Sequence, residues 1–82
     1  MIHQPTIPKP KVLITGINGL IGRLICKPLE QFYDIYGLDI APPFSEQVFQ
    51  ADIADYQQII QVFKTVTPVK HVIHLAAQIN PD

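Results

Sequence analysis

A glycine-rich turn between a strand-like run and a helix-like run constrains this chain more than any other feature. The segment Thr15-Gly16-Ile17-Asn18-Gly19-Leu20-Ile21-Gly22 directly follows a β-branched and aliphatic stretch at 11–15. Glycines at every third position let the backbone turn tightly and let the helix pack closely on the strand. The free amides of the first helical turn, with their partial positive charge, then suit a pyrophosphate. The segment therefore predicts a dinucleotide-binding strand–turn–helix unit.

The remaining sequence alternates strand-like and helix-like segments. Hydrophobic runs predict strands at 11–15, 35–39, 47–50 and 70–75. A helix is predicted from Leu20 onward, with a bend or an early end at Pro28, and a second helix opens at Asp55, which forms a capping-box pattern with Gln58. The predicted inner faces are Leu20, Ile21, Leu24, Ile25, Leu29 and Phe32 in the first helix, and Tyr56, Ile59, Ile60, Phe63 and Val66 in the second.

This order of segments predicts an α/β fold, the N-terminal part of a Rossmann-type doubly wound parallel sheet with strand order 3-2-1-4. In such a sheet the chain reverses direction between strands 1 and 4, and ligands bind at that point. The glycine turn and the Ala76-Ala77 end of the fourth strand are expected to meet there. Residues 1–10 are rich in proline and are expected to form a flexible lead-in.

Asp39 ends the second predicted strand, 17 residues after Gly22. A carboxylate at this position can accept both hydroxyl hydrogens of an adenosine ribose. It would also repel a 2′-phosphate by roughly 4 kcal/mol per unit charge at about 4 Å, before screening. The following residues, 40–43, contain no lysine or arginine to offset that repulsion. The sequence therefore favours NAD over NADP, although Arg23 is a nearby cation.

Composition excludes several classes of function. The net charge of −1 offers no basic patch for nucleic acid, and the apolar runs are too short to span a membrane. The chain has no signal-peptide pattern and a single cysteine, Cys26, which is expected to be an inert thiol; both agree with a cytoplasmic protein. His71 and His74, three apart on a strand, point to opposite faces, so no metal site is predicted.

The residues also resemble a known family. Thr15-Gly16-x-x-Gly19-x-x-Gly22, the strand-ending Asp39, the Asp52-Ile53 pair and His74-Leu75-Ala76-Ala77 are similar to the extended short-chain dehydrogenase/reductases. Within them, the NAD-dependent epimerase/dehydratase family of nucleotide-sugar enzymes is the nearest likeness. The resemblance spans residues 11 to 80 in order.

The resemblance implies a role for each matched position. The backbones of Leu20 and Ile21 would contact the pyrophosphate, Asp39 the ribose and Asp52 the adenine amino group. Ile53 would pack on adenine, although an Asp-Ile pair before a helix also fits a turn and plain core. The nicotinamide side would lie on the end of the fourth strand. The full predicted cofactor-binding set is Gly16, Asn18, Gly19, Leu20, Ile21, Gly22, Asp39, Asp52, Ile53, Leu75, Ala76 and Ala77.

The family's catalytic Tyr-x-x-x-Lys pair does not occur in this chain. Its three tyrosines, Tyr33, Tyr36 and Tyr56, are each followed four positions later by a residue other than lysine. Residues 11–82 are therefore expected to form a partial NAD-binding Rossmann domain that does not turn over substrate alone. The parent protein would be an epimerase, a dehydratase or a uronate-type dehydrogenase with a sugar or nucleotide-sugar substrate, expected as a homodimer. A non-catalytic dinucleotide sensor and a truncated gene product remain as alternatives.

Overall fold

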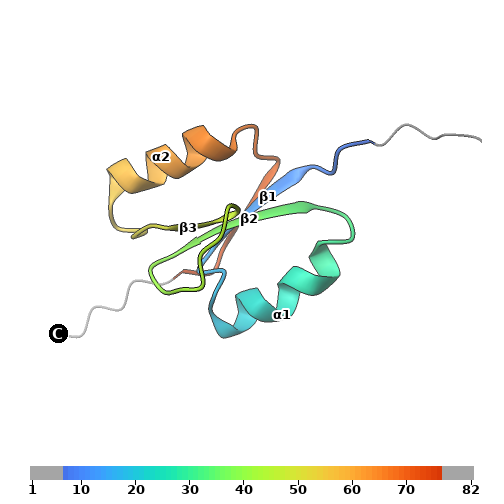
Figure 1. The fold of residues 1–82 in the computed structure, drawn as a ribbon, viewed down its shortest axis with the longest axis horizontal. Coiled ribbons are helices and arrows are strands. Elements are labelled where there is room, and N and C mark those ends of the chain that lie inside the picture. The colour runs from blue at the N-terminus through green and yellow to red at the C-terminus, as the bar shows by residue number, and fades with distance from the viewer. Residues whose placement is uncertain (1–6, 77–82) are drawn as a thin grey trace, which may run out of the picture.

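The computed structural model describes residues 7–76, which form a parallel four-stranded sheet with one helix on each face (Figure 1). The strand order is β3-β2-β1-β4, as the sequence predicts. In chain order the elements are β1 (Lys11–Thr15), α1 (Leu20–Leu29), β2 (Asp34–Asp39), β3 (Val48–Gln50), α2 (Tyr56–Val66) and β4 (His71–His74).

The core has two layers because β1 is covered on both faces. Successive side chains of a strand point to opposite faces, so Leu13 packs toward α2 while Val12 and Ile14 pack toward α1. All three are almost fully buried. In Figure 1, α1 and α2 lie on opposite sides of the sheet, and both helices start at the same end of it. That end holds the carboxyl termini of the parallel strands, where the glycine turn lies.

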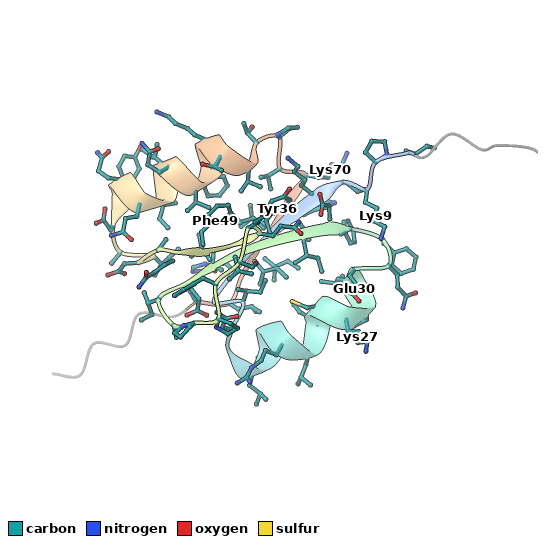
Figure 2. The ribbon with its side chains drawn as sticks, viewed as in Figure 1. Lys9, Lys27, Glu30, Tyr36, Phe49 and Lys70 are labelled. Atoms are coloured by element: carbon teal, nitrogen blue, oxygen red, sulfur yellow. The ribbon has the colours of Figure 1, made fainter. Side chains whose placement is uncertain are left out.

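Helix α2 begins where the sequence predicts. The Asp55 carboxylate accepts hydrogen bonds from the backbone N–H groups of Gln57 at 3.0 Å and Gln58 at 3.3 Å. Ile59, Phe63 and Val66 pack on the core as predicted, but Tyr56 is 73% exposed and Val62 is buried. The packed face of α2 meets Tyr36 and Phe49, whose side chains lie between the sheet and the helix in Figure 2.

The predicted inner face of α1 is wrong at four of its six positions. Leu20, Ile21, Leu24 and Phe32 are 57–73% exposed. The helix instead meets the sheet through the side that carries Gly22, whose backbone lies against that of Ile17. Because this glycine faces inward, Leu20, Ile21 and Leu24 face outward. Two predicted residues, Ile25 and Leu29, do pack on the core, together with Cys26.

Cys26 therefore lies on the packed face of α1. Partial burial, and after it the negative charge of Glu30, raise the pKa of the Cys26 thiol above its usual 9.0. The thiol stays protonated at neutral pH, which agrees with the prediction of an unreactive cysteine.

Candidate functional site

A cleft of about 530 Å³ opens at the carboxyl end of the sheet. It gathers seven of the twelve predicted cofactor-binding residues, which lie far apart in the sequence. Of the other five, Ala77 is outside the described residues, and Asn18, Leu20, Ile21 and Gly22 stand outside the lining. The cleft is lined by Gly16, Gly19, Leu38, Asp39, Ile40, Ala51, Asp52, Ile53, Leu75 and Ala76.

The floor of the cleft depends on a close approach of backbones at Gly16. This residue has a φ of +70°, which favours glycine, and a Cβ placed on it would lie 2.8 Å from the backbone nitrogen of Ala76. Its N–H donates to the carbonyl of Leu38 at 2.9 Å. Gly16 therefore brings the ends of β1, β2 and β4 together, and any side chain here would force them apart.

The glycine turn also needs a glycine in β2 that the sequence analysis overlooked. A Cβ on Gly37 would lie 2.7 Å from Cβ of Ile17, which is only 6% exposed. The absent side chain at Gly37 makes the space into which Ile17 packs. The glycine turn is therefore seated on the second strand as well as on its own helix.

The first turn of α1 lacks the protein cap that α2 has. The N-cap residue is Gly19, which has no side chain that could cap the helix. The first turn also contains no acidic residue. The backbone amides of Leu20 and Ile21 lie in that turn, while their side chains are exposed. An uncapped helix start of this kind offers N–H donors and a positive dipole end to an anion.

Asp39 lies opposite this turn and is held by two backbone N–H groups. Its Oδ2 accepts from the N–H of Asn18 at 2.9 Å, and its Oδ1 accepts from the N–H of Ala41 at 3.0 Å. A carboxylate has about four lone-pair sites on its two oxygens. Asp39 therefore keeps acceptor capacity for two further donors, which a ribose diol can supply.

Asp52 serves a turn and also lines the cleft. Its Oδ1 accepts from the N–H of Ala54 at 2.9 Å, and its own N–H donates to Oε1 of Gln58 at 2.8 Å. Oδ2 has no hydrogen-bond partner among residues 7–76. Ile53 is half-buried and packs against the α2-side core while reaching the cleft. Both the turn function and an adenine-binding function are therefore compatible with these positions.

The Thr15 hydroxyl joins β1 to the segment that follows β4. Its Oγ1 lies 3.1 Å from the N–H of Leu75, 3.2 Å from that of Ala76 and 2.7 Å from Nδ1 of His74. The N–H of Leu75 also donates to the backbone carbonyl of Thr15 at 3.0 Å. His74 ends β4 and is exposed.

Sequence reasoning missed three lining residues, Leu38, Ile40 and Ala51. Leu38 and Ile40 flank the predicted Asp39, and Ala51 precedes the predicted Asp52. Ala51 is almost fully buried at the end of β3. Its position at a strand end, beside a candidate residue, was the available signal.

Within residues 7–76 no three metal-ligating side chains cluster. None of the helices described is long and apolar enough to cross a membrane.

The sequence was compared with known proteins. A model of the NAD dependent epimerase/dehydratase family matches residues 12–82. The chain belongs to this family. Methionine adenosyltransferase 2 subunit beta of Xenopus tropicalis is 36% identical over 80 residues, covering 94% of this chain and 23% of the relative. The chain thus spans about a quarter of the length of that relative. No solved structure matches this chain.

The residues present fit the nicotinamide dinucleotide that membership in this family implies. The uncapped turn of α1 can receive phosphates, and the carboxylate of Asp39 can receive a ribose diol. Apolar side chains from Leu38, Ile40 and Ile53 line the same cleft, as an adenine ring requires. The glycine at position 16 keeps the floor low enough for a ligand to approach the backbone.

Proposed function

We propose that this chain binds NAD, in preference to NADP, in the cleft at the carboxyl end of its sheet. The observation that carries the proposal is the position of Asp39, fixed by two backbone N–H groups across from the uncapped start of α1. Its negative charge favours a ribose diol and repels a 2′-phosphate. Segment 40–43 contains no cation to reverse that preference.

The chain's contribution would be to bind and orient the cofactor. The amides of Leu20 and Ile21 would receive the pyrophosphate, Asp39 the ribose, and Asp52 the adenine amino group. Leu75 and Ala76, with Ala77 outside the described residues, would form the surface on the nicotinamide side. The bound dinucleotide would accept and return a hydride. None of the tyrosines is followed four residues later by lysine, so these residues supply no family-type proton-transfer pair.

For the whole protein we propose hydride transfer to and from a sugar carbon of a sugar or nucleotide-sugar substrate. Family membership supports this reaction class. A uronate-type dehydrogenase would use the same cofactor half and stays as an alternative. The catalytic part of the proposal is tested by sequencing the coding DNA beyond Asp82 and by assaying the encoded protein for NAD-dependent turnover. A downstream Tyr-x-x-x-Lys together with NAD-dependent turnover supports an enzyme, and the absence of both removes the catalytic part of the proposal.

A second candidate is a non-catalytic dinucleotide-binding subunit. It is favoured by the relative whose name makes it the beta subunit of a methionine adenosyltransferase. Such a protein would keep the cleft and need no tyrosine–lysine pair. It would bind NAD or NADP stoichiometrically and show no hydride transfer to sugars.

The cofactor preference is tested by Asp39→Ala. Calorimetric titration of the unchanged protein is expected to show tighter binding of NAD than of NADP. The substitution should weaken NAD binding by about tenfold, the worth of hydrogen bonds to a charged group. It should weaken NADP binding less or strengthen it, because the repulsion is removed. Unchanged affinities for both dinucleotides would exclude Asp39 from the ribose site.

A further inference from the structure

Asn18 is bound to the last residue of β2 and to the segment that follows it through all three of its N–H donors. Its backbone N–H donates to Oδ2 of Asp39 at 2.9 Å. Its side-chain Nδ2 donates to the carbonyl of Ala41 at 2.6 Å and to that of Pro43 at 2.9 Å. The glycine turn is thereby joined to a segment more than twenty residues away in the chain.

These hydrogen bonds use every donor that the Asn18 side chain has. A primary amide carries two N–H donors, and both are directed to carbonyl oxygens of the 40–43 segment. None is left for a phosphate oxygen. The side chain also stands outside the lining of the cleft. A direct contact between the Asn18 amide donors and the pyrophosphate is therefore incompatible with this arrangement.

The same bonds hold the other support of Asp39 in place. Ala41 donates its N–H to Oδ1 of Asp39 and accepts from Nδ2 of Asn18 through its carbonyl. Ala41 and the neighbouring Ile40 are exposed, so little packing fixes this segment. Asn18 thus holds Asp39 directly through one carboxylate oxygen, and indirectly through the other.

We propose that Asn18 is a positioning residue for cofactor specificity, which fixes Asp39 and the 40–43 segment for the adenosine ribose. This inference rests on the proposed function, because it requires the cleft to bind a dinucleotide. Asn18→Ala keeps the backbone N–H and removes both side-chain donors. It causes no backbone strain, because no residue other than glycine has a positive φ among those described. Without the hydrogen bond from Asn18 to its carbonyl, Ala41 can move, and its N–H can separate from Oδ1 of Asp39.

The test is equilibrium binding of four probes by calorimetry or competition: NAD, NADP, ADP-ribose and adenosine. Asn18→Ala is expected to weaken NAD, ADP-ribose and adenosine binding by a similar factor of about three to ten, the worth of one net hydrogen bond. The preference for NAD over NADP should fall by about the same factor. In an Asp39→Ala background the substitution should change NAD binding by less than about twofold, because the group it positions is gone.

Gln47→Ala is the matched control. The Gln47 amide also donates two hydrogen bonds, to Oδ1 of Asp34 at 2.8 Å and to the carbonyl of Ile35 at 3.1 Å, at the amino end of β2. It should lower stability in the same way without altering any of the four affinities. Asn18→Ser, which keeps one donor, serves if Asn18→Ala does not fold, and should show a smaller loss with the same pattern.

Three results would overturn the inference. Weaker ADP-ribose binding with unchanged adenosine binding would mean that Asn18 contacts the pyrophosphate. An equal loss in Gln47→Ala would mean that only general stability has changed. Unchanged affinities for all probes would remove any role in binding. Failure of the unchanged protein to bind NAD or NADP is distinct from these, since it refutes the proposed function and the inference with it.

Discussion

Gly22→Ala should destabilise the fold, although helix propensity alone predicts the opposite. Alanine in place of glycine in a helix is ordinarily favourable by roughly 0.5–1 kcal/mol. At Gly22, however, the new Cβ would lie 2.7 Å from the carbonyl carbon of Ile17 and 2.8 Å from its Cα, and closer still to its oxygen. Favourable carbon–carbon contacts lie at about 3.5–4.0 Å. Relief therefore needs a shift of roughly 1 Å between α1 and the glycine turn.

The size of the effect follows from the kind of atoms that are in the way. Overpacking of a closely packed site costs about 1–3 kcal/mol. The upper half of that range applies, because backbone atoms cannot rotate away and Ile17 is itself buried in the α1-side core. After the gain in helix propensity is subtracted, we expect Gly22→Ala to lower the free energy of unfolding by about 1–2.5 kcal/mol.

Gly19→Ala provides the comparison. Its added Cβ would have Gly16 O as its nearest neighbour, at 3.3 Å, and its backbone (φ −74°, ψ 177°) is open to alanine. We expect a loss of under about 1 kcal/mol in stability, but weaker binding of dinucleotide, because Gly19 lines the cleft. Urea unfolding followed by circular dichroism and calorimetric titration separate the two effects. A Gly22→Ala variant as stable as the unchanged protein would refute the packing argument.

Other predictions concern the N-cap of α2, the Thr15 hydroxyl and the Cys26 thiol. Asp55→Ala should cost about 1 kcal/mol, seen in urea unfolding, because Gln57 and Gln58 lose their cap, whereas Asp55→Ser should restore most of the stability. Thr15→Val should lower stability by about 1–3 kcal/mol, because the N–H of Ala76 loses the buried hydroxyl that accepts its hydrogen bond, and an unchanged urea midpoint would count against this contribution. Because the pKa of Cys26 is raised in the folded state, its contribution to stability is present below about pH 9 and is lost as pH rises through the raised pKa. Cys26→Ser should therefore flatten the alkaline part of a stability–pH curve, and a curve identical to that of the unchanged protein would contradict this.

The sheet could be predicted from sequence because its signals are local. Each strand is a short apolar run with a turn residue beside it, and the glycine spacing marks the strand-to-helix turn at 16–22. The start of α2 at Asp55 is equally local, since the cap and its partners lie within three residues. The strand order then follows from general rules for parallel sheets.

The rotation of the helices could not be predicted in the same way. The face that a helix buries depends on what it meets, and α1 is oriented by the contact of Gly22 with Ile17. The predicted apolar stripe therefore included the exposed Leu20 and Leu24 along with the packed Ile25 and Leu29. The hydrogen-bond partners of the Asn18 side chain could not be predicted either, because Ala41 and Pro43 lie beyond an entire helix and strand.

The cleft is assembled from the ends of all four strands, so a ligand can occupy it only while the chain is folded. Gly16 and Ala76 come within contact only when β1 and β4 are paired, so an unfolded chain offers nothing for a ligand to hold. A ligand bound only by the folded form stabilises it by about 2.7 kcal/mol at one hundred times its dissociation constant. A dinucleotide in this cleft would thus act as a structural support as well as a reactant. Because proteases cleave the unfolded chain, a higher cellular concentration of the dinucleotide would then slow degradation of the protein.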